Sequence, residues 1–184
     1  IRVVVLNDNE KIWKFINSNK KETVKFFKNN GVIMPKNNKY LRGNKLNALV
    51  KLIAPQGSNG PTFMVYKNFD YIMNWNASIN YALGVGLLSD SISSSLKFTI
   101  PSTIKSDILL DSTKIKTIQK LLKEQGFYPA TPTGFYGNLT TQSIKQYQNY
   151  LKTKLKRFRY KSGKLIIEDG YPSADLYNEL VNIK

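Results

Sequence analysis

Residues 68–92 read N-F-D-Y-I-M-N-W-N-A-S-I-N-Y-A-L-G-V-G-L-L-S-D-S-I, and this stretch decides how the first half of the chain is interpreted. The protein has a formal net charge of +16, yet the only charged side chains in the stretch are Asp70 and Asp90. In so basic a chain, a long run that is nearly free of charge and ends in apolar residues is typical of a buried core element. We therefore expect a helix from about Ala77 to Ile92 that is buried in the core.

Polar side chains stand inside this apolar run, and a core helix alone does not explain them. They are Asn68, Asn74, Trp75, Asn76, Ser78 and Tyr81. A buried amide without hydrogen-bond partners costs roughly 1–3 kcal/mol. Asn76 is therefore either bonded to the backbone or lines a cleft that holds a polar ligand, and Ser78 either caps the helix or faces the same ligand.

The composition excludes several kinds of chemistry. The chain contains no Cys and no His, which excludes nucleophiles activated by histidine, thiolate catalysis and zinc sites with the usual ligands. We expect no cofactor and no metal site, so that acid–base chemistry depends on carboxylates, Tyr or Lys. The longest apolar run, Tyr81–Leu88, is far shorter than the ~20 residues that span a bilayer, so no integral membrane segment is expected.

The excess of positive charge points to an anionic partner. The chain has 28 Lys and Arg against 12 Asp and Glu, spread along its length. Such a surface favours nucleic acid, anionic lipid or an acidic cell-wall polymer, and the charge alone does not distinguish these.

The first half is predicted to be mainly helical with a small β-hairpin. Two β-prone runs, 49–53 and 62–66, flank the turn-rich segment A-P-Q-G-S-N-G-P and form the expected hairpin. Asn19 followed by Glu22 resembles a capping box, which predicts a helix start there and a helix end at Gly31. Residues 1–5 read as a short strand.

The second half is predicted to be a bundle of three short helices. Ile115, Ile118 and Leu122 have helical spacing, and Gly126 ends that helix. A second helix contains Ile144, Tyr147 and Leu151, and a third begins near Ser173. The segment between the halves gains Ser, Thr and Pro and loses periodicity, which predicts two domains, 1–96 and 112–184, joined by a linker at 97–111.

Residues 68–92 resemble the "NF…WN-x-S…YA-x-x-V…L-x-D-x-I" signature of the MltB-type lytic transglycosylases, which cut the glycan strands of bacterial peptidoglycan. The resemblance extends upstream through Gly31, Val32, residues 52–55, Gly57 and residues 60–63. It implies part of a lysozyme-like transglycosylase lobe. It also implies that Trp75, Asn76, Ser78 and Tyr81 contact the bound glycan.

The second half resembles the common peptidoglycan-binding repeat domain. The matching residues are Ile118, Gln119, Leu122, Gly126, Phe127, Thr133, Gly134, Phe135, Tyr136, Gly137, Thr140, Tyr147, Gln148 and 169–172. The resemblance implies a binding role for Gly134, Phe135, Tyr136, Gly137, Thr140, Tyr147 and Gln148. The glycines, Thr140 and Tyr147 are expected mainly to form the fold, and Phe135 and Tyr136 either belong to the core or face the sugar-peptide ligand. The chain departs from the family pattern in two places. Thr133 and Gly134 stand where the family usually has Asp-Gly. A basic insertion at 152–164 is either a solvated loop or strengthens attachment to the cell wall through its charge.

The reaction of the resembled enzymes uses a single glutamic acid in an apolar cleft, where its pKa is raised enough to hold a proton. None of the five Glu here is predicted to lie in such a cleft. Glu22 is next to lysines, Glu124 and Glu179 are expected on solvated helix faces, Glu168 lies in a loop, and Glu10 precedes Lys11. Asp70, the other candidate, is expected to be solvated or to cap a helix. None of these residues matches the catalytic motif of the resembled family, which lies upstream of the region matched here. The resemblance therefore implies that the catalytic Glu is not in this chain, which by itself is expected to be inactive.

The resulting interpretation is a peptidoglycan lytic transglycosylase of the periplasm or bacterial cell envelope. It cleaves the MurNAc-GlcNAc glycan non-hydrolytically to leave 1,6-anhydro ends, and its partners are glycan strands and stem peptides. The first alternative is a non-catalytic peptidoglycan-binding protein that has lost the active half. The second is a nucleic-acid-binding protein, suggested by the charge and by Phe158 and Tyr160 among basic residues, although no nucleic-acid motif supports it.

Overall fold

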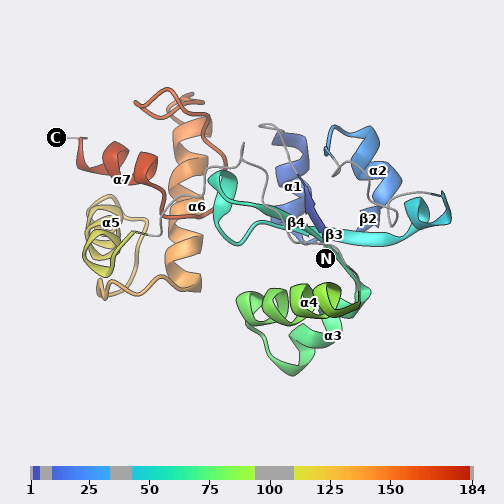
Figure 1. Cartoon of the computed structure of the whole chain (residues 1–184). Helices are drawn as coiled ribbons and strands as arrows, with labels where there is room; N and C mark the ends of the chain where they lie inside the picture. Colours follow the sequence, from blue (N-terminus) through green and yellow to red (C-terminus); the bar gives the residue numbers. More distant parts are fainter. Residues whose placement is uncertain (1, 5–9, 34–42, 94–109, 183–184) are drawn as a thin grey trace. The chain divides into compact units, whose positions relative to one another are not determined.

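The computed structural model describes residues 2–4, 10–33, 43–93 and 110–182 (Figure 1). The chain divides into two compact units, residues 1–55 with 60–105 and residues 56–59 with 106–184. Most of the linker expected at 97–111 lies outside the described residues. None of the described helices is long and apolar enough to cross a membrane.

The first unit contains an antiparallel sheet with the strand order β1-β4-β3-β2. The strands are β1 (Arg2–Val4), β2 (Glu22–Thr23), β3 (Leu49–Ile53) and β4 (Thr62–Tyr66). The predicted hairpin is β3–β4, in which Val50 lies opposite Tyr66 and Ile53 opposite Phe63. The hairpin is confirmed, and β1 and β2 extend it to four strands. Two short 3-10 helices, Gly43–Asn47 and Gly57–Asn59, precede and follow β3.

Two helices, α1 (Glu10–Ser18) and α2 (Val24–Asn29), lie between β1 and β3 in the sequence. The predicted capping box is wrong: Asn19 follows α1 with a φ of +54°, and Glu22 lies in β2. Thr23 is the actual cap of α2, because its hydroxyl accepts a hydrogen bond from the Phe26 N–H at 3.0 Å. Gly31 follows α2 with a φ of +89°, which fits the predicted helix end.

The hairpin is followed by α3 (Lys67–Trp75) and α4 (Ile79–Ser93). The helix predicted at 77–92 is present, but the prediction that it is buried is wrong. Ala82 and Leu83 pack into a core cluster with Phe63, Val65 and Phe69. On the other faces of α4, Ile79, Val85, Leu88 and Ile92 are 40%, 37%, 61% and 78% exposed. An apolar composition shows that a helix needs a cover, but it does not show which residues provide it, and the described residues leave most of this apolar surface exposed.

The second unit is a bundle of α5 (Ser112–Glu124), α6 (Asn138–Thr153) and α7 (Ala174–Val181), as the helical spacing predicts. Ile118, Leu122, Ile144, Leu151 and Leu176 form its core and are at most 1% exposed. The caps explain the helix boundaries. The Asp111 carboxylate accepts from the Lys114 N–H at 2.9 Å, and the Ser173 hydroxyl accepts from the Leu176 N–H at 3.1 Å.

Candidate functional site

The turn between α3 and α4 positions the predicted glycan-binding residues. The Asn76 N–H donates to the Ile72 carbonyl at 2.9 Å and ends α3. The Asn76 Oδ1 accepts from the Ser78 N–H at 3.0 Å, and the Ser78 Oγ accepts from the Tyr81 N–H at 3.2 Å. Ser78 therefore caps α4, which is one of its two expected roles. The Asn76 side chain is half-buried, with its carbonyl end bonded to backbone and its Nδ2 group not bonded to any described residue.

An exposed aromatic pair lies beside this amide. The rings of Trp75 and Tyr81 have their centroids 5.7 Å apart at an interplanar angle of 41°. Trp75 is 78% exposed and Tyr81 is 39% exposed. The turn thus brings Trp75, Asn76, Ser78 and Tyr81 into one surface region of the first unit, with two rings and an amide available to a ligand.

Asp70 is held by two lysines, not simply solvated or capping a helix as expected. Its Oδ2 lies 2.6 Å from the Lys21 Nζ and its Oδ1 lies 2.8 Å from the Lys51 Nζ. Partial burial by itself raises the pKa of Asp70, but the hydrogen bonds and charges of both lysines outweigh it and lower the pKa. A carboxyl group held ionised in this way is unsuited to donate a proton.

The prediction for Glu179 is wrong, because this side chain is buried rather than solvated. It is 1% exposed, and its oxygens accept from the Arg157 guanidinium at 2.7 and 3.2 Å and from the Lys161 N–H at 2.9 Å. Burial by itself raises the pKa of Glu179, but these hydrogen bonds outweigh it and lower the pKa. Glu124 is exposed, as expected.

In the second unit, the buried Gln119 holds the loop that contains Thr133 and Gly134. Its Oε1 accepts from the N–H groups of both residues at 2.8 Å, and its Nε2 donates to the Thr140 Oγ1 at 2.9 Å. Gly134 has a φ of +84°, and a Cβ there would lie 2.6 Å from the Ser112 carbonyl oxygen. Only glycine fits this position without a shift of the backbone.

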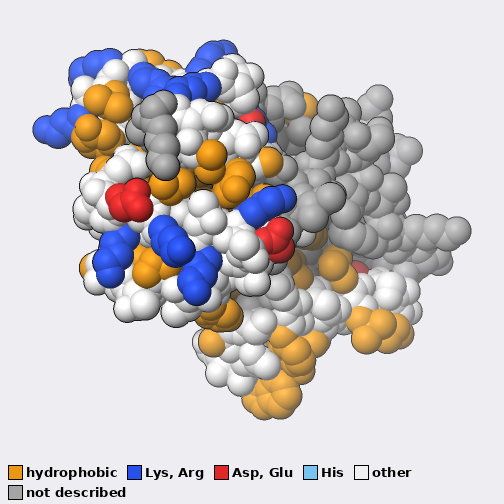
Figure 2. Space-filling model, turned by 90° about the vertical axis from the view of Figure 1, so that its left-hand side faces the viewer, with side chains coloured by type: hydrophobic (Ala, Val, Ile, Leu, Met, Phe, Trp, Pro, Cys, Tyr) orange, Lys and Arg blue, Asp and Glu red, His pale blue; other side chains and the backbone are white. Residues whose placement is uncertain are grey.

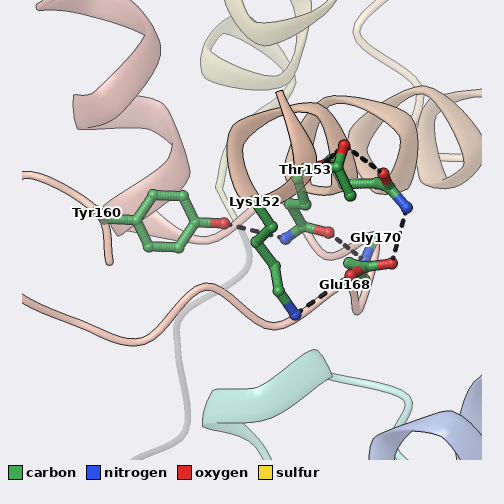
Figure 3. A network of polar contacts seen from close by, with 7 residues as sticks. Lys152, Thr153, Tyr160, Glu168 and Gly170 are labelled. Carbon is green, nitrogen blue, oxygen red and sulfur yellow. Dashed lines mark hydrogen bonds and ion pairs between the residues drawn. The ribbon is translucent and has the colours of Figure 1, made fainter. Parts of the chain in front are cut away.

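Gln148 plays the same role on α6 (Figure 3). Its Oε1 accepts from the Gly170 N–H at 3.0 Å, and its Nε2 donates to the Tyr160 hydroxyl at 3.0 Å and to the Asp169 carboxylate at 2.9 Å. Each of the two helices therefore uses one buried amide to fix a loop around a glycine with positive φ.

These contacts separate the framework residues from those that can face a ligand. Thr140, Tyr147 and Gln148 are at most 1% exposed. Tyr136 is half-buried, its hydroxyl donates to the Gly170 carbonyl at 3.1 Å, and burial raises its pKa to about 12. Phe135, by contrast, is 76% exposed. Its ring is the ligand-facing candidate among the residues of this loop.

Sequence reasoning gave Gln119 no binding or structural role of its own, although the amide organises the loop. A signal was present, since Gln119 is a polar residue between Ile118 and Leu122 on the apolar face of a predicted helix. The buried role of Glu179 had a weaker signal, because its partners come from a loop more than 15 residues away.

Each unit matches the model of a known protein family. Residues 2–90 match the transglycosylase SLT domain, and residues 111–153 match the putative peptidoglycan binding domain. The chain is therefore similar to the transglycosylase SLT family over its first half and to the peptidoglycan-binding family over part of its second half. No curated protein sequence matches the chain.

Two solved structures of SltB3 from Pseudomonas aeruginosa are similar to this chain, one in complex with NAG-anhNAM-pentapeptide and one with NAG-NAM-pentapeptide. Each has a TM-score of 0.66 and 24% sequence identity, and the match covers 98% of this chain and 44% of that chain. The similarity shows a shared fold. The present chain spans less than half the length of SltB3.

Proposed function

We propose that this chain belongs to a peptidoglycan lytic transglycosylase of the periplasm or cell envelope, and that it supplies part of the substrate cleft together with a wall-binding domain. The observation that carries the proposal is the exposed ring pair Trp75–Tyr81 beside the half-buried amide of Asn76, in a domain of the transglycosylase family. The peptidoglycan-binding domain that follows in the same chain fits the same substrate.

The chemistry of this surface suits an N-acetylated sugar. The Nδ2 group of Asn76 can donate to an N-acetyl carbonyl or a hydroxyl, while the bond from the Ser78 N–H to Oδ1 fixes the direction of the amide. The Trp75 ring offers a flat apolar face to the apolar side of a pyranose. Tyr81 packs against Trp75 and limits the ring positions that Trp75 can take.

We expect the proton donor of the proposed reaction to lie outside the described residues. Glycosidic cleavage needs an acid that keeps its proton near neutral pH. Asp70 and Glu179 are instead paired with cations that lower their pKa values. Glu10 and Glu124 are exposed, and Glu168 lies 3.2 Å from the Lys152 Nζ. We expect the cover of the apolar side of α4 to lie outside the described residues as well, because these residues leave most of that side exposed.

A binding assay combined with a product assay tests this proposal. We expect the chain to sediment with purified peptidoglycan, because the binding bundle is complete, and to release no anhydro-muropeptides during a long digestion analysed by chromatography. Failure to sediment contradicts the wall-binding role. Release of anhydro products by the chain alone shows that a carboxylate within it is catalytic, Asp70 being the first to examine.

The role of Asn76 is tested in the full-length enzyme. Asn76→Ala removes the amide but loses only one partly exposed hydrogen bond, so we expect a severe loss of turnover and a stability change of about 1 kcal/mol or less. Asn74→Ala, two residues away on the exposed end of α3, is the matched control and should keep its activity. A large drop in melting temperature with normal activity per folded molecule identifies Asn76 as purely structural.

The alternative is a peptidoglycan-binding protein without catalytic activity. Its support is that Asp70 and Glu179 are held ionised and that Glu168 is paired with Lys152. The complete coding sequence separates the two functions. A glutamate-bearing segment upstream of the matched domain supports the enzyme, whereas an open reading frame without one supports the binding protein.

A further inference from the structure

The basic insertion K-T-K-L-K-R-F-R-Y-K-S-G-K, residues 152–164, is not accounted for by either domain family. The match to the peptidoglycan-binding family ends at residue 153, the second residue of the insertion. The insertion contains seven Lys or Arg and no Asp or Glu. In Figure 1 it follows the carboxyl end of α6.

Three residues of the insertion, Lys152, Arg157 and Tyr160, are held by contacts with the rest of the second unit, and we call them the frame of the insertion. Lys152 lies 3.2 Å from the Glu168 carboxylate, and Arg157 forms two hydrogen bonds with the buried Glu179. Tyr160 is 6% exposed, and its hydroxyl accepts a hydrogen bond from the Gln148 side-chain amide at 3.0 Å, drawn as a dashed line in Figure 3. These contacts assign the paired cations a structural role.

Backbone bonds close the loop on itself. The Tyr160 N–H donates to the Lys164 carbonyl at 2.8 Å, and the Ile166 N–H donates to the Phe158 carbonyl at 2.9 Å. Gly163 makes the turn with a φ of +86°. The insertion therefore presents its remaining side chains from a defined backbone, which reduces the entropy lost when they bind.

The side chains that the frame leaves exposed form what we call the insertion surface. Its members are Lys154, Leu155, Lys156, Phe158, Arg159 and Lys161. Arg159 and Lys161 each donate one hydrogen bond to a backbone carbonyl, of Gly163 and Asn182 respectively, and both residues remain exposed. Leu155 is 47% exposed and Phe158 is 55% exposed, so two large apolar groups stand among four cations. Figure 2 shows Lys and Arg side chains interspersed with hydrophobic ones on the upper part of the face in view.

We propose that the insertion surface binds an anionic phospholipid membrane. Cations near such a membrane are attracted by its negative surface potential, while exposed apolar side chains enter the boundary between headgroups and acyl chains. The insertion surface supplies both kinds of group on one loop. This proposal does not depend on the transglycosylase activity.

Two observations favour lipid over the other anionic partners. Binding of single-stranded nucleic acid needs rings on which bases stack, but Tyr160 is buried and Phe158 is the only exposed ring of the insertion. Leu155 has no flat face for a base or a sugar, whereas an aliphatic side chain is well suited to hydrocarbon. The pairing of Leu155 with Phe158 is thus better explained by lipid than by nucleic acid or glycan.

The test measures binding of the whole chain to vesicles. We expect flotation with vesicles of phosphatidylglycerol and phosphatidylcholine, and little or none with vesicles of phosphatidylcholine alone. Each Lys or Arg near an anionic surface changes the partition coefficient about fivefold. Replacing the four cations of the insertion surface by Gln should therefore weaken binding by about a hundredfold or more. Leu155→Ser with Phe158→Ser should weaken it at unchanged net charge.

A control with the same loss of charge separates local binding from a general effect of the basic protein. Lys114, Lys116, Lys120 and Lys123 are exposed on α5, and their replacement by Gln lowers the net charge by the same four units. We expect this control to bind vesicles far better than the insertion variant. Equal losses in the two variants overturn the proposal, as does unchanged binding of the insertion variant. Loss of peptidoglycan or nucleic-acid binding in the insertion variant, with vesicle binding intact, also overturns it.

Discussion

Truncation of Arg157 offers a stringent test of how the second unit is stabilised. The Glu179 side chain is 0% exposed, whereas that of Arg157 is 34% exposed, so the two partners differ in how well water can replace the lost contact. Arg157→Ala leaves a buried carboxylate whose remaining hydrogen bond comes from the Lys161 N–H at 2.9 Å. Because water can replace the contacts of Arg157 but not those of Glu179, removal of the arginine should be the more destabilising of the two truncations.

The expected size of the effect follows from this geometry. Breaking a buried ion pair by removing one partner costs about 3–5 kcal/mol, and the remaining bond to Glu179 places this case near the lower end. For a domain of 60–100 residues, 1 kcal/mol shifts the melting temperature by about 4–8 °C. We therefore expect the transition of the second unit to fall by about 12–24 °C.

Scanning calorimetry of the whole chain measures this transition. Both tryptophans, Trp13 and Trp75, lie in the first unit, so tryptophan fluorescence identifies its unfolding separately. Arg159→Ala is the matched control: Arg159 is exposed and bonds the Gly163 carbonyl, and its loss should cost less than about 1 kcal/mol. Equal shifts in the two variants refute the reasoning.

The pH dependence gives an independent check. Because the folded-state pKa of Glu179 lies below the ordinary value of 4.5, the pair stabilises the fold fully above that value. The stabilisation is lost as the pH falls through the folded-state pKa of Glu179. The stability difference between the wild type and Arg157→Ala should therefore shrink in acid, and a constant difference contradicts the ion-pair explanation.

Three further changes are expected to have graded effects on thermal stability. Gly134→Ala should lower the thermal stability clearly more than Gly163→Ala. Both glycines have φ near +85°, but a Cβ at Gly134 would lie 2.6 Å from a backbone oxygen, whereas a Cβ at Gly163 meets nothing within 4 Å. Equal losses of stability would show that backbone strain alone decides the effect. Gln148→Leu should cost about 2–4 kcal/mol by leaving buried polar groups unsatisfied, against a small change for the exposed Gln146→Leu on the same helix. Asp70→Asn should remove the stabilisation that the two lysine pairs provide, which is less than about 1 kcal/mol. This stabilisation is present above pH 3.8 and is lost as the pH falls through the lowered pKa of Asp70. A destabilisation that persists in acid would have another cause.

The positions of α4, of the hairpin and of the three helices of the second unit could be predicted from the sequence because local patterns specify them, whereas α1 and α3 had no such prediction. The spacing of Ile115, Ile118 and Leu122 defined α5, and the β-prone runs around a turn defined β3 and β4. The capping box failed because Thr23 and Asn19 are both acceptable cap residues, and pairing of Glu22 in β2 selected Thr23.

The burial of individual side chains could not be predicted, because it depends on residues distant in the sequence. From the sequence, Glu179 was expected to be solvated, because its partner Arg157 lies in the insertion, 22 positions earlier in the chain. Helix α4 looked like a core element, yet most of its apolar surface is uncovered by the described residues. Periodicity shows which face of a helix is apolar, but not what packs on it.

What the sequence determined by itself was the order of the two domains, the presence of α4 and of the three helices of the second unit, and the set of residues at the α3–α4 turn. These features depend on local spacing and on motifs, which the linear chain contains in full. The tertiary structure alone decided that Asn76 is bonded through one end of its amide and that Asp70 and Glu179 are held ionised. It also decided that four cations of the insertion remain exposed, whereas Arg157 pairs with the buried Glu179. The reason is physical: pKa values, exposure and hydrogen-bond partners depend on what surrounds a group in space, and folding brings together groups that are far apart in the sequence.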